Sequence, residues 1–349
     1  LNRLSLWFFP LLIIALLGDL GLALQILKEK ELFKGPTGHP KKAVVLVPIR
    51  GEDPAFDQHV NSLLNQDHSD YELYYIVDKD EAEFQMRRLA RYKVNVIVAE
   101  QECKSCSGKV NAIIYGAKKF RDKVIVIADS DTVYPKSWLR DMTSALEDST
   151  ASTTFTWPKP LRITLRNLIR SGFWTFGFES QALGGRFLYG GSMAFRENFF
   201  DDKALEELSD EWCDDCALTR IVKERKGKIN YVARSMPLNL FDERELWNWS
   251  KKEAKALVMY SKKGVYAFIF VIFIMIALIV AFFNTFNPIY LTPYFMWILK
   301  NVIRGRRYIK DSILPALMSI VALYYSIPVV ISAFLDKEVR WRGKVYKTK

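Results

Sequence analysis

The sequence predicts an α/β domain with a mostly parallel sheet and helices on both faces, together with N- and C-terminal transmembrane helices. Two observations support this class. Runs with few or no charges occupy residues 4–27, 265–283 and 312–335, and each has about the 20 residues that a helix needs to cross a hydrocarbon core. Between the first two runs, short apolar segments alternate with amphipathic ones, which is the order typical of a parallel sheet.

The elements follow one another closely along the chain. The first run is interpreted as a retained membrane anchor, because it is long for a signal peptide and has no convincing cleavage site. Its Asp19 is expected to face another helix or the membrane interface. Strands are expected at residues 43–48, 73–77, 94–99 and 124–128, and helices before residue 63 and at 81–92 and 109–120. The expected domains are an N-terminal transmembrane helix (1–29), a linker (30–42), a soluble domain (43–255) and a C-terminal transmembrane region with a basic tail (256–349).

The positive charge is concentrated beside the apolar runs. The formal net charge is +11, yet the residues from Ser250 onward contain 16 Lys and Arg against 4 Asp and Glu. Basic residues flanking membrane spans follow from the positive-inside rule and from attraction to anionic lipid. The charge therefore indicates a membrane surface as partner and no nucleic acid. Residues 157–187 mix aromatic and basic side chains and are expected to lie at the membrane interface.

Acidic residues follow three of the expected strands. Asp129 and Asp131 come directly after residues 124–128, Glu52 follows residues 43–48, and Asp78 and Asp80 follow residues 73–77. The carboxyl ends of parallel strands meet at one edge of a sheet, where ligands bind. Two carboxylates separated by one residue can share a hard divalent cation, which can neutralise a diphosphate. The pattern predicts a site for Mg²⁺ or Mn²⁺ at Asp129 and Asp131.

An ordered set of motifs resembles the family 2 glycosyltransferases, and within them the ceramide-glucosyltransferase-like group. The resemblance covers roughly residues 41–255 plus the tail, and it implies a GT-A-type, nucleotide-sugar-binding catalytic domain. The matching segments are VPIRGEDP (47–54), Asp78, SGKVNAI (107–113), IADSDTVYP (127–135), YGGSMAFR (189–196), EWCDDCALTR (211–220) and WRGKVY (341–346).

The resemblance also implies roles for individual residues. Asp215 would be the catalytic base with Asp214 beside it, and Asp129 and Asp131 would hold the metal. Asp78 and Glu52 would hold the nucleoside, and Lys109 would contact the donor phosphate or stabilise the acidic cluster. The residues expected to bind the donor are Pro48, Arg50, Glu52, Asp78, Asp80, Lys109, Asn111, Asp129, Gly191 and Trp249.

One segment departs from the family pattern. The family usually carries Gln/Arg-x-x-Arg-Trp before the C-terminal spans, whereas residues 245–249 read ELWNW and keep only Trp249. In processive synthases this segment helps to hold donor and acceptor, so its loss weakens the interpretation as a polymer synthase. Arg244, Lys251 and Lys252 lie close enough in sequence to replace the missing cation.

All four cysteines fall into two C-x-x-C pairs. Cys103 and Cys106 form one pair, and Cys213 and Cys216 bracket the two acids of the proposed base. Such spacing is found in structural zinc sites. Disulfides and ordinary buried thiols are equally open alternatives. The three histidines, which are His39, His59 and His68, are given no role.

The resemblance implies an inverting, metal-dependent transfer of a sugar, of glucose type, from a nucleotide-diphosphate sugar such as a UDP-sugar to a lipid hydroxyl. Transfer would occur at the cytosolic face of the cell membrane. A polysaccharide synthase or a polyprenyl-phosphate glycosyltransferase would use the same donor chemistry. A non-catalytic membrane scaffold is the alternative of another class. Product size separates the first two interpretations, and metal-dependent hydrolysis of a nucleotide sugar separates both from the third.

The membrane topology admits two arrangements. A cytosolic catalytic domain and C-terminus require an even number of crossings after Lys255. Residues 288–299 are too short for a span, so they either lie flat, or they cross while residues 312–335 re-enter without crossing. The sequence favours the flat arrangement because residues 312–335 are long and uncharged.

Overall fold

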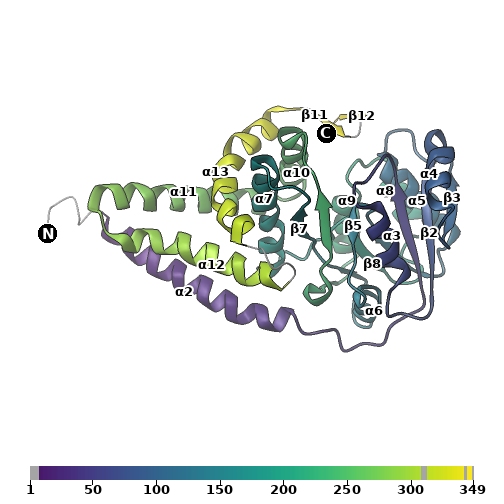
Figure 1. Ribbon diagram of the computed structural model, residues 1–349, viewed down its shortest axis with the longest axis horizontal. Helices are drawn as coiled ribbons and strands as arrows, with labels where there is room; N and C mark the ends of the chain where they lie inside the picture. The colour runs from purple at the N-terminus through teal and green to yellow at the C-terminus, as the bar shows by residue number, and fades with distance from the viewer. Residues whose placement is uncertain (1–7, 308–312, 342–343, 348–349) are drawn as a thin grey trace. The chain divides into compact units, whose positions relative to one another are not determined.

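The computed structural model describes residues 8–307, 313–341 and 344–347. The chain divides into two compact units (Figure 1). The sheet unit comprises Leu32–Leu161 and Leu183–Asp242, and the helical unit comprises the segments up to Glu31, Arg162–Ala182 and from Glu243 onward. Residues 162–182 and 243–255, which the sequence placed in the soluble domain, thus group with the apolar helices. Sequence assignments at residues 1–7, 308–312, 342–343 and 348–349, including part of the WRGKVY tail, lie outside the described residues.

A seven-stranded sheet forms the centre of the sheet unit. Its strand order is β3-β2-β1-β4-β8-β6-β9. Neighbouring strands are parallel except at β8, which is antiparallel to β4 and to β6. The predicted mostly parallel sheet is confirmed. The strands are β1 (Ala43–Ile49), β2 (Tyr71–Asp78), β3 (Asn95–Ala99), β4 (Val124–Ala128), β6 (Ala151–Thr153), β8 (Ser192–Phe195) and β9 (Ile229–Tyr231).

Helices cover both faces of this sheet. Alternate residues of β1 point to opposite faces, so Val44 and Leu46 pack with α5, α8 and α9, whereas Val45 and Val47 pack with α3, α4 and α6. Each face is therefore sealed from water and its strands read as continuous apolar runs. The helices are α3 (Phe56–Leu64), α4 (Ala82–Leu89, after the 3₁₀ turn η1, Lys79–Glu81), α5 (Gly108–Lys119), α6 (Trp138–Ser144), α8 (Asp202–Ser209) and α9 (Asp214–Glu224).

A small second sheet fixes the chain that follows β4. Its order is β5-β10-β7, formed by Thr132–Val133, Leu238–Phe241 and Trp157–Pro160, with the 3₁₀ turn η2 (Ala233–Ser235) before β10. The Leu240 amide donates to the Asp131 carbonyl at 3.2 Å. This sheet holds the backbone of the D-x-D turn against β10.

The helical unit contains the apolar segments. Three of its helices, α2, α11 and α13, are long and apolar enough to span a membrane, and α2 and α11 leave many large apolar side chains exposed. A two-stranded ribbon, β11 (Glu338–Trp341) with β12 (Lys344–Lys347), follows α13. The helices are α2 (Phe9–Leu32), α7 (Leu165–Ala182), α10 (Leu246–Tyr260), α11 (Lys262–Thr285), the 3₁₀ turn η3 (Pro288–Leu291), α12 (Thr292–Arg306) and α13 (Ile313–Leu335).

Within the helical unit, α12 runs alongside α2 in the same direction. Thr292, at the start of α12, donates to Asp19 at 2.5 Å, and Arg304, near its end, donates to Glu29 through Nε at 2.8 Å. The expectation that Asp19 faces another helix agrees with this contact. In Figure 1, α2, α11 and α12 lie side by side, whereas α13 runs across them beside α7 and α10. The flat arrangement expected for residues 288–299 stays a prediction, and α12 lies beside α2.

Candidate active site

Three carboxylates gather around one ammonium group at the carboxyl end of β4. Lys109 Nζ, from the first turn of α5, lies 2.7 Å from Asp129 Oδ1 and 3.0 Å from Asp214 Oδ2. It also donates to the Gly190 carbonyl at 3.1 Å. The Gly190 amide donates to Asp215 Oδ2 at 2.9 Å. Four residues predicted from the sequence therefore meet at one place, which we call the acidic cluster (Lys109, Asp129, Asp214 and Asp215).

The segment before β8 approaches this cluster with its backbone. A Cβ at Gly190 would lie 2.8 Å from Lys109 Nζ and 3.1 Å from Asp214 Oδ2. At Gly191 a Cβ would lie 2.9 Å from Asp129 Oδ2. A Cβ at either position would therefore press on the flexible end of Lys109 or Asp129, and glycine lets the backbone approach both side chains closely. The predicted involvement of Gly191 thus has a steric basis.

The charges of the cluster do not cancel. Burial lowers the pKa of the Lys109 ammonium, but the neighbouring Asp129, Asp214 and Asp215 carboxylates outweigh burial and raise this pKa above its ordinary value. Lys109 is therefore positive at any physiological pH and compensates one of three negative charges. Asp214 Oδ2 is buried and, although it lies near the ammonium, has no hydrogen-bond partner among the described residues. The arrangement favours an additional cation.

The D-x-D turn is fixed by residues that the sequence did not assign. Ser130, between the two acids, donates to the buried Asp53 at 2.5 Å. Tyr134 OH accepts from the Asp129 amide at 2.8 Å and donates to the Gly191 carbonyl at 2.7 Å. The phenol thereby joins the metal-binding turn to the glycine segment. Neither contact has a local sequence signal.

His59 contacts the backbone of the same turn at Thr132. Its Nδ1 lies 2.7 Å from the Thr132 carbonyl and its Nε2 lies 2.9 Å from Tyr75 OH. A ring that donates to Thr132 accepts from Tyr75, which is the neutral form. Burial lowers the pKa of His59 to about 4. No role was expected for this histidine, although it lies with Phe56 and Val60 on the apolar face of α3, a spacing that predicts burial.

A second charged group follows β1 and β2. Arg50 donates to Asp78 Oδ2 at 2.5 Å and to Asp80 Oδ2 at 2.8 Å. Asp78 is the last residue of β2, and its Oδ2 would lie 3.4 Å from a Cβ at Gly108, the first residue of α5. Because Gly108 precedes Lys109, this group adjoins the acidic cluster through the start of α5.

The chain matches a known family of enzymes over most of its length. The family model of glycosyl transferase family 21 matches residues 11–349. The chain belongs to this family. It is therefore a glycosyltransferase, and the resemblance to the ceramide-glucosyltransferase-like group is confirmed. No curated protein sequence matches the chain.

Solved structures agree with the fold of this family 21 glycosyltransferase. A mannosyltransferase from Pyrobaculum calidifontis in complex with GDP-Man and Mn²⁺ has 17% sequence identity and a TM-score of 0.52, covering 94% of this chain and 99% of that chain. TarS 1-349 from S. aureus has 13% identity and a TM-score of 0.39, covering 88% of this chain and 96% of that chain. The first likeness confirms the predicted GT-A type of fold.

Some residues predicted for donor binding are not members of the acidic cluster, and their role stays a prediction. Asn111 accepts from the Glu102 amide at 2.7 Å and donates to the Glu100 carbonyl at 2.9 Å, so its side chain holds a loop. Glu52 is exposed, and Pro48 is half-buried within β1. Trp249 belongs to the helical unit, where its ring packs on Phe173 and Trp174.

The residues at the end of β4 fit a hard divalent cation. Asp129 and Asp131 offer only oxygen ligands, which Mg²⁺ and Mn²⁺ prefer. Both are half-buried, and the glycine at position 191 keeps the space beside Asp129 Oδ2 open. Within the described part of the chain, no third side chain joins this pair in a compact ligand group. The phosphate oxygens of a donor would complete the coordination.

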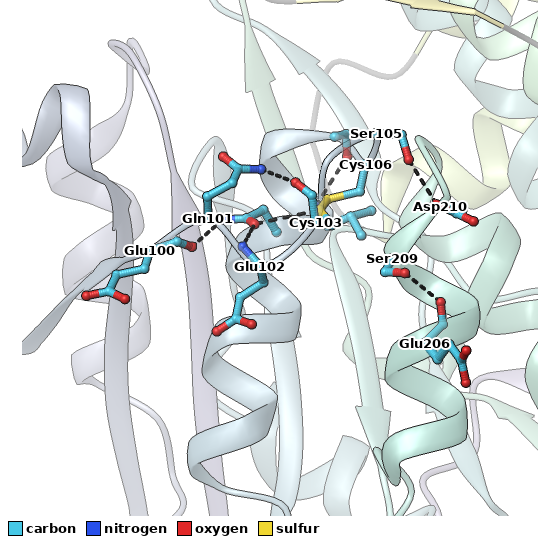
Figure 2. Close-up of a disulfide and its surroundings, with 12 residues drawn as sticks. Glu100, Gln101, Glu102, Cys103, Ser105, Cys106, Glu206, Ser209 and Asp210 are labelled. Carbon is cyan, nitrogen blue, oxygen red and sulfur yellow. Dashed lines mark hydrogen bonds between the residues drawn. A yellow bond between two sulfur atoms is a disulfide. The ribbon is translucent and has the colours of Figure 1, made fainter.

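Each C-x-x-C motif is closed by its own sulfur–sulfur bond. Cys103 is bonded to Cys106, and Cys213 to Cys216. The loops that carry them touch: Ser105 donates to Asp210 at 2.9 Å (Figure 2), and the Ser107 amide donates to the Glu211 carbonyl at 3.2 Å. A four-cysteine zinc site needs four free thiolates, whereas here each pair forms a disulfide. Structural zinc stays a prediction that metal analysis can test.

Proposed function

We propose that this family 21 glycosyltransferase moves a hexose from a nucleoside-diphosphate sugar to a lipid hydroxyl, with inversion and with Mg²⁺ or Mn²⁺ as cofactor. The observation that carries the proposal is the acidic cluster, in which Lys109 leaves a net negative charge beside the D-x-D turn. Carboxylates that supply only oxygen ligands can hold a divalent cation. Such a cation stabilises the negative charge of a diphosphate leaving group.

The donor would lie between the acidic cluster and the Arg50 group. Asp78, at the end of β2, supports an assignment to nucleoside binding because it sits at the ligand-binding edge of the sheet. Lys109 would move from its carboxylate partners toward the donor phosphates, exchanging one set of anions for another. A bound divalent cation would stabilise the charge that develops on the departing diphosphate.

Asp215 would accept the proton of the attacking hydroxyl. Its Oδ2 is held by the Gly190 amide and its Oδ1 by the Cys216 amide at 2.8 Å, so the carboxylate is oriented by two backbone donors. Asp214 is instead occupied with Lys109. The distinction favours Asp215 as base and Asp214 as the residue that positions the lysine. Direct attack on the donor sugar then gives inversion.

The helical unit supports a lipid acceptor. An open groove in it is lined by Arg166, Arg244, Trp247 and Tyr325, among others. Arginine beside aromatic rings is a combination that suits a lipid headgroup at the membrane interface. The exposed apolar faces of α2 and α11 are consistent with lipid contact as well. UDP-glucose and a hydroxylated sphingolipid base or ceramide are accordingly the first donor and acceptor to test.

The packing also supports one topology, with the sheet unit cytosolic. If α2 crosses the membrane toward that unit, α12 crosses in the same direction, because Thr292 lies level with Asp19 and Arg304 with Glu29. Arg306 would then be cytosolic, as the positive-inside rule requires, and α13 would not need to cross.

An impermeant thiol reagent on intact cells tests this topology. Cysteine at Asn284, in the last turn of α11, should be labelled, and cysteine at Arg306 should not; both positions are exposed. The native cysteines would lie on the unlabelled side. Labelling at Arg306 would restore the flat arrangement, and labelling of a tag at Lys349 would overturn a cytosolic C-terminus.

Mass spectrometry of the lipid product tests the function. The purified chain is incubated with Mn²⁺, a panel of UDP- and GDP-sugars and candidate lipids. A single added hexose on a lipid hydroxyl is expected. A polymer would indicate a processive synthase, and a hexosyl polyprenyl phosphate would indicate the polyprenyl-phosphate alternative. Neither transfer nor donor hydrolysis with any sugar would favour a non-catalytic scaffold.

A further inference from the structure

The start of α9 brings two cysteines and the proposed base around one point. The ligand atoms of Cys213, Asp215 and Cys216 all lie within 4.8 Å of one another. Cys213 Sγ lies 3.1 Å from Asp215 Oδ1. Within the residues that the structure describes, no other three His, Cys, Asp or Glu ligand atoms come this close together. The spacing of the two cysteines is that of metal-binding C-x-x-C motifs.

We propose that reduction of the Cys213–Cys216 disulfide creates a site for a thiophilic divalent cation of the Zn²⁺ class, with Asp215 as third ligand, and that occupation of this site stops transfer. The inhibitory part rests on the proposed role of Asp215 as base. A dithiol reductant would supply the two electrons and become a disulfide itself, while the Cys213–Cys216 bond breaks to give two thiols. Both thiols would release their protons to solvent when the cation binds.

Local electrostatics favour a cation over two free thiolates. Two thiolates would add to the negative charge of Asp214 and Asp215, and Lys109, which is paired with Asp129 and Asp214, compensates only one of the charges already present. A divalent cation removes this repulsion. Cys213 is the N-cap of α9 and Cys216 lies in its first turn, where the helix dipole also favours anionic ligands.

The proposed cysteine site and the D-x-D turn would select different metals. Asp129 and Asp131 offer hard oxygen ligands, whereas two sulfur ligands select Zn²⁺ or Cd²⁺ over Mg²⁺ and Mn²⁺. The Gly190 amide, which donates to Asp215 Oδ2, would serve as the outer partner that orients the ligating carboxylate. A cation held there would occupy the oxygen that must take the proton.

The other C-x-x-C pair provides a matched control. Beside Cys103 lies the amide oxygen of Asn111, at 3.6 Å from the sulfur, instead of a carboxylate. After reduction this pair would offer two sulfur ligands and no carboxylate in a compact group. The double variant Cys103→Ser/Cys106→Ser removes it while leaving the proposed site intact.

Cadmium titration of the purified full chain tests the proposal. The protein is reduced, freed of reductant under argon and titrated with Cd²⁺ while the cadmium–thiolate absorption is recorded. All variants are made in the Cys103→Ser/Cys106→Ser background, because that pair, once reduced, also offers two sulfur ligands. In this background one tight equivalent is expected for the reduced chain, and none for the oxidised chain or after the further change Cys213→Ser/Cys216→Ser. Asp215→Asn should weaken binding by more than the roughly 10- to 100-fold that loss of an outer partner costs.

Two further results separate the site from the mechanism. Unchanged tight binding in Cys213→Ser/Cys216→Ser or in Asp215→Asn would overturn the site. One equivalent of Cd²⁺ should stop Mn²⁺-supported transfer by the reduced chain, with recovery on chelation, and normal turnover of the cadmium-loaded chain would overturn the inhibitory role. The absorption readout does not depend on turnover, so it tests the site even if another residue is the base.

Discussion

Two groups of close charges, one in each unit, differ in whether their charges cancel. The acidic cluster of the sheet unit has three carboxylates to one ammonium, and Lys109 and Asp129 each keep 28% of the side chain exposed. The group in the helical unit has two acids and two bases, with Lys300 and Arg304 almost fully buried. We call it the balanced cluster, and its members are Glu29, Glu179, Lys300 and Arg304.

The net charge and the solvent exposure of the two clusters indicate different roles. A balanced, buried group satisfies its own members and fixes which helices lie together. An unbalanced, accessible group keeps an excess negative charge. It can therefore bind a cation, and through that cation an anionic ligand. The same residue types therefore hold helices together in one unit and form the proposed reaction centre in the other.

Removing the cation from the sheet unit should have the largest effect. Chelation of divalent ions should abolish transfer, and Asp131→Ala should cost several kcal/mol of transition-state stabilisation because a metal ligand is lost. Initial rates with and without excess Mn²⁺ measure both effects. Asp148→Ala, which removes an exposed partner of Lys228, is the control and should leave the rate unchanged. Near-normal turnover in excess chelator would contradict the account of this cluster.

Unbalancing the helical unit should destabilise the protein without involving the reaction centre. Arg304→Met leaves Glu29 without its main partner, and an uncompensated buried charge typically costs about 3–5 kcal/mol. Thermal unfolding in detergent measures the loss. The double variant Arg304→Met/Glu29→Gln removes one charge of each sign and should recover most of it. Equal instability of the single and double variants would mean that charge balance is not what holds these helices.

Another group, the buried His59, has no carboxylate among its hydrogen-bond partners, and burial is the largest cause of its lowered pKa. Its pKa of about 4, against 6.5 ordinarily, means that the unfolded chain binds the extra proton between these values. The free energy of unfolding should therefore fall by about 3 kcal/mol as the pH drops from about 6.5 to about 4. His59→Asn, whose amide can still donate to Thr132, should lack this contribution. Identical pH profiles would contradict the neutral buried ring.

The sheet and Asp129 could be predicted because their signals are local. Residues 124–128 are an uninterrupted apolar run, and the acids that follow it necessarily lie at the edge of the sheet. Lys109, Asp214 and Asp215 came from the order of motifs. The contact between Lys109 and Asp214, at 3.0 Å, depends on chain folding over about one hundred residues.

The remainder depended on tertiary partners. The direction of Asn111 is set by the loop above it. Residues 288–299 were judged too short for a span from the sequence. The contacts that pair the following Lys300 and Arg304 could not be predicted, because their acidic partners are 121 and 275 residues away in the sequence. The burial of His59 was not predicted, although the apolar spacing of its helix is a signal for it.

The central claim is that Asp215 of the unbalanced cluster takes the proton of the acceptor hydroxyl. Donor binding and turnover of Asp215→Asn and Asp214→Asn, measured side by side on the purified chain with Mn²⁺, test it most directly. Asp215→Asn should bind the nucleotide sugar nearly as well as the unmodified chain and turn over about 100-fold more slowly or worse. Asp214→Asn should be milder. A reversed order, with Asp214→Asn inactive and Asp215→Asn near normal, would contradict the account.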